Sequence, residues 1–149
     1  MTGPEVWMGF DFGRRRIGVA VAQTLTGEAR ALTTVTAVGE RPDVEKIMAL
    51  IKEWCPTGLV VGLPVNADGS EHDVTRSARR FGNRLANDTR LPVHWIDERL
   101  SSHAAEERLL ERGTRLNTRN RGAIDAEAAS VILETWLAER PKPMQESDT

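Results

Sequence analysis

The segment Gly58–Leu63 (Gly-Leu-Val-Val-Gly-Leu) is apolar at every position. A strand with one face in water alternates apolar and polar residues, whereas a parallel strand covered on both faces is apolar throughout. Segments with helical spacing of apolar residues precede and follow it, at residues 44–54 and 74–85. A buried strand between two helices predicts a mixed α/β sheet with helices packed on it.

Three strands are expected before this unit. Residues 6–12 and 17–22 are apolar runs, and the short segment between them holds a glycine and three arginines. This pattern predicts two strands joined by a tight basic turn. Residues 31–37 are rich in Thr and Val, which favours a third strand. The N-terminal part of the chain therefore predicts a meander.

The remaining elements follow from apolar spacing and from residues that begin or end helices. We expect a first helix between Pro42-Asp43 and Pro56, a second over residues 71–87, a short strand over 92–96, a third helix from Ser101-Ser102 to near Arg112-Gly113, and a last helix over 125–139.

The chain has 149 residues, of which 40% are hydrophobic, enough for one compact domain with its own core. We expect this domain to cover residues 1–140 and the polar, proline-containing residues 141–149 to form a disordered tail. The chain contains no run of about 18 apolar residues, so we expect no membrane span. The N-terminus has no export pattern, and the single cysteine, Cys55, has no disulfide partner. Both features favour the cytoplasm.

Three acidic residues occupy positions that are apolar by context. Asp11 lies inside an apolar strand, Glu98 at the end of another, and Asp125 at the head of the apolar stripe of the last helix. Burying a carboxylate is costly unless a cation binds it. Gly9 and Gly13, two positions either side of Asp11, predict open space beside its side chain. The three acids predict a divalent metal site.

The pattern alone leaves alternatives open for each acid. Asp11 could cap the following turn, Glu98 could pair with Arg99 on the surface, and Asp125 could complement the helix dipole. Asp97 and Glu98 point to opposite faces if the strand continues, so only one of them can share a site with Asp11. Glu127 and Glu134 lie outside the apolar stripe and are predicted to be surface residues.

Carboxylate oxygens suit Mg²⁺ or Mn²⁺, as one or two ions that keep several waters. Zinc is poorly supported, because the three histidines lack ligand spacing and the cysteine is alone.

Arginine makes up most of the positive charge, since only three of the 20 basic residues are lysines. Its planar fork suits phosphate groups, although the codon usage of a GC-rich genome would also favour it. Arginines gather in the turn after Asp11, on the second helix and in residues 112–121, which could hold a phosphate backbone or form a solvated linker. The candidate substrate-binding residues are Arg14, Arg15, Arg16, Arg76, Arg80, Arg99, Arg115, Arg119 and Arg121.

Four segments, in this order, resemble the motifs of one family. Residues 11–20 look like its opening motif Asp-x-Gly-x-x-x-Ile-Gly-Val-Ala, and residues 61–71, 97–102 and 124–129 match its other three. The family is YqgF, also called RuvX: bacterial ribonuclease H-like proteins regarded as pre-16S rRNA nucleases and earlier as Holliday junction resolvases. The resemblance covers about residues 6–138. One departure is Ala123, where many members have a basic residue.

The resemblance implies a ribonuclease H-like fold: a mixed five-stranded sheet that starts with an antiparallel meander and carries helices on both faces. It also implies that Asp11, Glu98 and Asp125 are the catalytic, metal-binding acids, which selects Glu98 over Asp97.

The implied activity is metal-dependent hydrolysis of phosphodiester bonds at the 5′ end of pre-16S rRNA. Cleavage of branched DNA is the runner-up, and a non-catalytic nucleic-acid-binding assembly factor is a further alternative. Nucleic acid and ribosomal particles are the expected partners, with no membrane, and the chain is expected to be a monomer or weak homodimer. Asp-x-Gly also opens the phosphate-binding hairpin of actin-like and sugar-kinase folds, but those need two lobes and this chain supplies one.

Overall fold

The computed structural model describes residues 5–38, 41–66, 68–97, 101–113 and 121–139. The expected disordered tail over residues 141–149 lies outside them. None of the described helices has the length and apolar character needed to cross a membrane.

A six-stranded mixed sheet in the order β4-β3-β2-β1-β5-β6 forms the centre of the structure. Its strands are β1 (Val6–Phe12), β2 (Arg16–Gln23), β3 (Ala29–Val38), β4 (Arg41–Pro42), β5 (Gly58–Leu63) and β6 (Val93–Asp97). Strands β1, β2 and β3 form the predicted antiparallel meander, and β5 and β6 run parallel to β1. The sixth strand was not predicted: β4 has only two residues, which pair with the end of β3.

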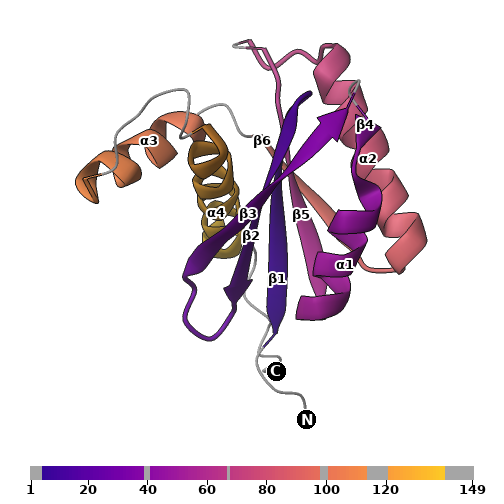
Figure 1. Cartoon of the computed structure of the whole chain (residues 1–149), viewed down its shortest axis with the longest axis horizontal. Helices are drawn as coiled ribbons and strands as arrows, with labels where there is room; N and C mark the ends of the chain where they lie inside the picture. Colours follow the sequence, from indigo (N-terminus) through magenta and orange to yellow (C-terminus); the bar gives the residue numbers. More distant parts are fainter. Residues whose placement is uncertain (1–4, 39–40, 67, 98–100, 114–120, 140–149) are drawn as a thin grey trace, which may run out of the picture.

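Within the described residues, four helices pack on both faces of this sheet: α1 (Val44–Trp54), α2 (Asp73–Thr89), α3 (Ser101–Glu111) and α4 (Arg121–Glu139). Helices α1 and α2 lie on one side of the sheet, and α4, with α3 against it, lies on the other (Figure 1). The last helix begins at Arg121, four residues before the predicted start. Asp125 therefore lies in the second turn and does not head the helix.

Local signals explain where the first two helices begin and end. The Asp43 side chain accepts a hydrogen bond from the Lys46 backbone N–H at 3.1 Å, and α1 ends at Cys55, whose φ of 48° is left-handed. Helix α2 starts after His72, whose Nδ1 accepts from the Val74 backbone N–H at 3.2 Å. The Thr75 hydroxyl accepts in turn from the His72 backbone N–H at 3.1 Å.

Alternation along β1 separates two apolar cores. Met8, Phe10 and Phe12 pack with residues of α1 and α2. Trp7, on the opposite face, packs with Leu133 and its neighbours on α4. Because side chains alternate along a strand, Asp11 shares the face of Trp7, which is the face that α4 covers.

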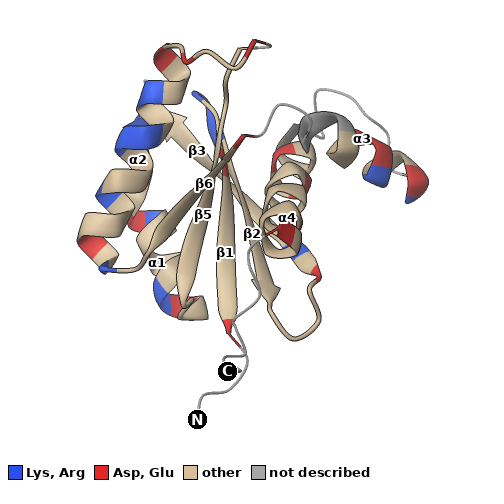
Figure 2. Ribbon diagram, turned by 180° about the vertical axis from the view of Figure 1, so that it is seen from behind, with Lys and Arg blue, Asp and Glu red and all other residues tan. Residues whose placement is uncertain are grey.

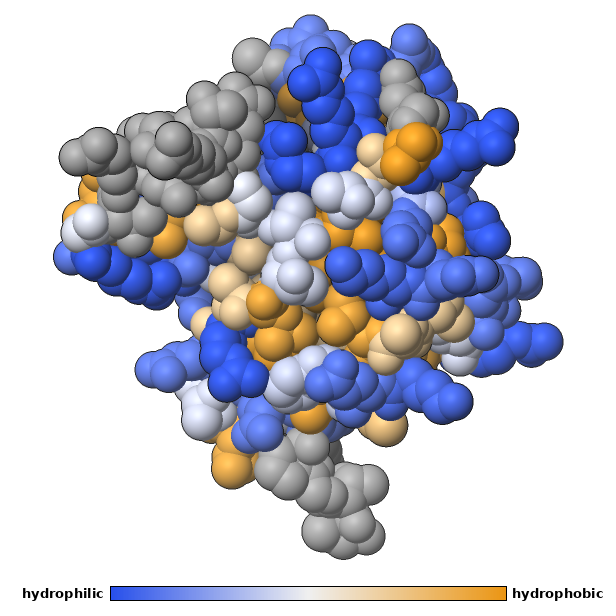
Figure 3. Space-filling model, viewed as in Figure 1, coloured by the Kyte–Doolittle hydropathy of each residue, from blue (hydrophilic) through white to orange (hydrophobic). Residues whose placement is uncertain are grey.

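The face seen in Figure 1 is hydrophilic at its rim, and apolar atoms gather near its centre, over the sheet (Figure 3). Most side chains of β3 are only partly buried, and Val38 at its end is 81% exposed.

Helix α3 is held against α4 by ion pairs that the sequence did not predict. Glu127, expected on the surface, is 4% exposed. Its carboxylate accepts hydrogen bonds from Arg112 at 2.9 Å and from Arg108 at 3.3 Å. Glu134 pairs with Arg108 through one oxygen and accepts from the Ala29 backbone N–H at 2.9 Å through the other. The prediction of a surface residue is wrong for Glu127, because Arg108 on α3 and Arg112 just after it meet this side of α4; the Glu134 side chain is 25% exposed and is also paired.

Candidate active site

Asp11 lies near the carboxyl end of β1, between two glycines on the neighbouring strands. The sheet register pairs it with Gly18 on β2 and with Gly62 on β5. Directly paired residues share a face, so no side chain flanks Asp11 across the sheet on either side. Asp11 is nevertheless buried, with 8% of its surface exposed.

The sequence predicts that Gly9 and Gly13 leave open space beside Asp11, but in the structure other parts of the chain approach these two glycines closely. A Cβ atom on Gly9 would lie 3.0 Å from the Leu133 Cβ and 3.1 Å from the Ala129 carbonyl oxygen, so Gly9 admits helix α4. A Cβ on Gly13 would lie 2.9 Å from the Arg16 carbonyl oxygen, so Gly13 permits the tight turn. The glycines that flank Asp11 across the sheet are on β2 and β5, and their register cannot be read from one strand's sequence.

Gly18 brings the backbone of Asp125 onto the sheet next to Asp11. A Cβ atom at Gly18 would lie 1.9 Å from the Asp125 carbonyl oxygen and 2.8 Å from the Ala126 nitrogen, so only glycine allows this approach. The Thr34 hydroxyl, on the next strand, donates to the Gly122 carbonyl at 2.5 Å and anchors the first turn of α4. Asp11 and Asp125 thus occupy neighbouring positions on one face, at the carboxyl edge of the parallel strands.

Asp125 is engaged by a residue predicted to bind substrate. The Nε atom of Arg16 donates to Oδ2 of Asp125 at 2.6 Å, and the two side chains are 28% and 24% exposed. The guanidinium of Arg16 thus contacts the proposed metal ligand itself. The two residues are 109 positions apart in the chain, and the sequence did not predict their contact.

The third predicted acid, Glu98, lies outside the described residues. Its neighbour Asp97 pairs with Leu63, whose side chain packs in the core between the sheet and helices α1 and α2. Asp97 is therefore on the face opposite to Asp11. Among the residues that the structure describes, no group of three or more His, Cys, Asp or Glu side chains is placed to hold a metal ion. The three-acid site stays a prediction.

The other candidate arginines fall into three groups. Arg14 and Arg15 are exposed in the turn between β1 and β2, close to the acids in the fold. Arg76 pairs with Asp73, and Arg80 donates to the Ser77 hydroxyl at 3.0 Å. These two lie on α2, which packs on the opposite face of the sheet and carries a mixed row of basic and acidic residues (Figure 2). Arg99, Arg115 and Arg119 are outside the described residues, and Arg121 is the first residue of α4.

Comparison with known proteins places the chain in a family. The family model described as "RuvX: Holliday junction resolvase" matches residues 5–139. A protein of Azotobacter vinelandii is 47% identical over 141 residues, covering 95% of this chain and 99% of that one. A protein of Nitrosococcus oceani is 48% identical over 137 residues, covering 92% and 89%. Both are named "Putative pre-16S rRNA nuclease".

The chain belongs to the RuvX family. Solved structures agree on the fold. RuvC of T. thermophilus, in complex with a Holliday junction substrate, superposes with a TM-score of 0.60 at 20% identity and covers 91% of this chain and 95% of that one. The yeast mitochondrial Holliday junction resolvase Ydc2 gives a TM-score of 0.52 at 8% identity, covering 88% and 77%. The predicted ribonuclease H-like fold is confirmed.

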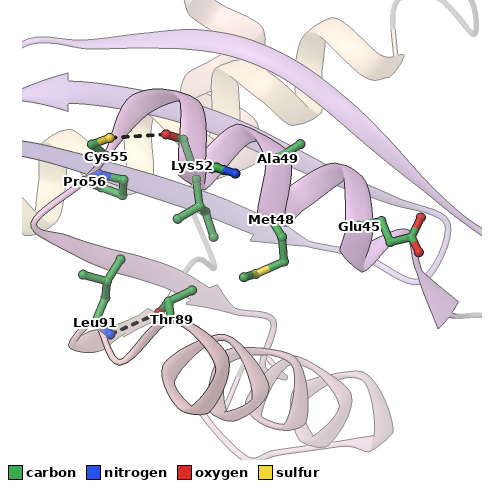
Figure 4. A pocket seen from close by; sticks show the side chains of 9 residues that line it. Glu45, Met48, Ala49, Lys52, Cys55, Pro56, Thr89 and Leu91 are labelled. Carbon is green, nitrogen blue, oxygen red and sulfur yellow. Dashed lines mark hydrogen bonds between the residues drawn. The ribbon is translucent and has the colours of Figure 1, made fainter.

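The chain also has an apolar cavity of about 580 Å³, which lies away from the acids. It is bounded by α1 and by the end of α2, and Met48, Cys55 and Leu91 are among its lining residues (Figure 4). Cys55 precedes β5 and Leu91 precedes β6, so the cavity is at the amino edge of these strands. Asp11 is at the carboxyl edge, and the cavity is therefore no part of the candidate active site.

Proposed function

We propose that this chain is a metal-dependent endonuclease that hydrolyses phosphodiester bonds at the 5′ end of pre-16S rRNA, acting in the cytoplasm as a monomer or weak homodimer. The observation that carries the proposal is that buried Asp11 pairs with Gly18 and that the Asp125 backbone lies against this glycine, on one face of the sheet and at the edge where open α/β sheets bind their ligands. The names of the relatives support pre-16S rRNA as the substrate.

The donor chemistry fits Mg²⁺ or Mn²⁺, as one or two ions. Asp11 offers its carboxylate oxygens, and the residues paired with it on the two neighbouring strands are both glycines. Asp125 offers Oδ1, while its Oδ2 already attracts a positive group. Glu98 is proposed as the third ligand, because Asp97 lies on the wrong face. A bound divalent ion would supply an activated water and charge neutralisation at the leaving oxygen.

The arginines of the chain are proposed to bind the phosphates of the substrate. Arg14 and Arg15 are exposed in the turn that follows β1, so they can neutralise the phosphates on either side of the bond to be cut. Arg99, Arg115, Arg119 and Arg121 are proposed to extend this contact. Arg76 and Arg80 are on the far face of the sheet and would reach only a substrate that passes over its edge.

Two alternative functions predict different experimental results. The description of the family favours Holliday junction cleavage, which requires two active sites on one branched substrate and so a symmetric dimer. A non-catalytic assembly factor would bind RNA without cutting it and would not need a cation for binding.

The proposal is tested with purified protein, a labelled precursor 16S rRNA fragment and a four-way DNA junction, each with Mg²⁺, Mn²⁺ or EDTA. Wild type should cut the RNA fragment only with a divalent ion, and Asp11→Asn should not cut it. Asp97→Asn, a carboxylate change at the same sheet edge on the opposite face, is the matched control and should cut normally.

Equal cleavage by wild type and Asp11→Asn would refute the assignment of the site. Preferred cleavage of the junction by a dimer would favour the resolvase alternative. RNA binding that survives EDTA, with no cut product under any condition, would favour the assembly factor.

A further inference from the structure

We propose that Arg16 is a displaceable counter-ion of the metal site: it holds Asp125 until a divalent cation takes that carboxylate, and its guanidinium then binds a substrate phosphate. This inference rests on the proposed metal-dependent function. It gives Arg16 two successive partners and separates it from Arg14 and Arg15, which are exposed in the turn just before it.

The contact itself is one that can be exchanged. One nitrogen of Arg16 donates to one oxygen of Asp125, and this is the only hydrogen bond recorded for either side chain among the described residues. An arginine that fixes a carboxylate permanently is often bidentate, with two parallel N–H···O bonds. The single Nε contact leaves the terminal nitrogens of Arg16 and Oδ1 of Asp125 available for other partners.

Glu127, two residues along the same helix, shows what a permanent pair looks like in this molecule. Its side chain is 5% exposed, and its carboxylate accepts hydrogen bonds from Arg108, Arg112 and the Ser130 hydroxyl. Arg16 and Asp125 are instead 28% and 24% exposed. Solvent screens the attraction between two partly exposed charges, so this ion pair is weak and Arg16 can be displaced from Asp125.

Arg16 is not needed to hold helix α4 in place. The Thr34 hydroxyl binds the Gly122 carbonyl, and Gly18 admits the Asp125 backbone to the sheet without any contribution from the Arg16 side chain. Apolar packing of Leu133 and its neighbours against β1 completes the interface. Removing the guanidinium should therefore change the charge at the site and leave the position of Asp125 unaltered.

Electrostatics sets the direction of the effect. A guanidinium on Asp125 neutralises part of the negative charge that attracts a cation, and it repels a cation bound to the same carboxylate. Loss of Arg16 should thus tighten metal binding, whereas a residue that merely positioned Asp125 would weaken metal binding when removed. Loss of the freed guanidinium should at the same time weaken the hold on substrate phosphate.

The test measures binding of Mg²⁺ and Mn²⁺ alone by calorimetry, with no nucleic acid present. Arg16→Ala and Arg16→Gln should each bind the ion about tenfold more tightly than wild type. Arg15→Ala, an exposed arginine one position away, is the matched control and should change the affinity by less than about twofold. At saturating Mg²⁺, the same Arg16 variants should raise KM for the precursor RNA fragment more than they lower kcat, and Arg16→Lys should recover part of the loss in KM.

Failure of this inference is distinguishable from failure of the proposed function. If wild type binds the ion and Asp11→Asn weakens that binding, but Arg16→Ala binds the ion equally or less tightly, only the role of Arg16 is wrong. If wild type binds no divalent ion, the metal-dependent function is wrong and the inference falls with it. If both Arg16→Ala and Arg16→Gln are unfolded by circular dichroism, Arg16 is a structural residue and the inference is likewise refuted.

Discussion

Replacing Gly18 with alanine tests directly how the structure places Asp125. The added Cβ atom would lie 1.9 Å from the Asp125 carbonyl oxygen, and real Cβ atoms essentially never approach other atoms closer than 3.0 Å. From 1.9 to 3.0 Å is a shift of at least about 1.1 Å, which α4 must make because the opposing atoms are backbone. Such overpacking costs about 1–3 kcal/mol. The better strand propensity of alanine returns about 0.5–1 kcal/mol, so the net loss of stability should be about 0.5–2 kcal/mol.

The same shift should impair activity much more than stability. A misplacement of about 1 Å at a reacting group can cost about 100-fold in rate. Gly18→Ala should therefore lose about 100-fold in kcat/KM for the precursor RNA fragment at a temperature where the variant is fully folded. Urea unfolding gives the stability, and initial cleavage rates give the activity.

Gly122→Ala is the matched control, since Gly122 lies on the α4 side of the same interface. Its Cβ would lie 3.4 Å from the Thr34 hydroxyl oxygen, an ordinary contact. This variant should be as stable as wild type or about 0.5 kcal/mol more stable, and it should cut RNA normally. If Gly18→Ala equals wild type in both stability and cleavage, the close approach of α4 at Gly18 does not position Asp125.

Three further predictions concern other groups. Burial raises the pKa of the Glu127 carboxyl, but hydrogen bonds from Arg112, Arg108 and Ser130 outweigh it and hold the pKa below 4.5. The ionised carboxyl stabilises the fold above the unfolded pKa, and this stabilisation is lost as pH falls through the lower folded pKa. When the pH is lowered below about 4.5, the urea concentration at the unfolding midpoint should therefore decrease for wild type and decrease less for Glu127→Gln. Glu127→Gln should also cost about 1–3 kcal/mol at pH 7, because two arginines lose their carboxylate, whereas Glu139→Gln, on the exposed end of α4, should cost almost nothing. EDTA should abolish cleavage and leave the circular dichroism spectrum unchanged, because two apolar cores hold the sheet; unfolding on metal removal would contradict this.

The fold could be predicted where burial leaves a pattern in the chain. Residues 58–63 are apolar throughout because both faces of β5 are covered, and they form the strand that the pattern predicts. The two-residue β4 carries no such pattern and was missed. The start of α4 was placed too late because its first turn has no apolar stripe, and it is stabilised by the hydrogen bond between Thr34 and Gly122, a contact between distant segments.

The inward positions of Asp11 and Asp125 could be predicted from the sequence, but the residues that contact them could not. Alternation along β1 and helical spacing along α4 indicated that Asp11 and Asp125 face inward, and the structure places both on one face. The glycines across the sheet from Asp11 depend on strand register, which a single sequence does not display. The pairing of Arg16 with Asp125 depends in the same way on how α4 docks on β2.

The most direct test of the central claim is the 5′ end of 16S rRNA in cells of the source organism depleted of this protein. Depletion should cause precursor 16S rRNA with unprocessed 5′ ends to accumulate, as mapped by primer extension. Wild type and Asp97→Asn should restore the mature end, and Asp11→Asn, expressed at the same level, should not. Full restoration by Asp11→Asn, or normal 5′ ends after depletion, would contradict the account.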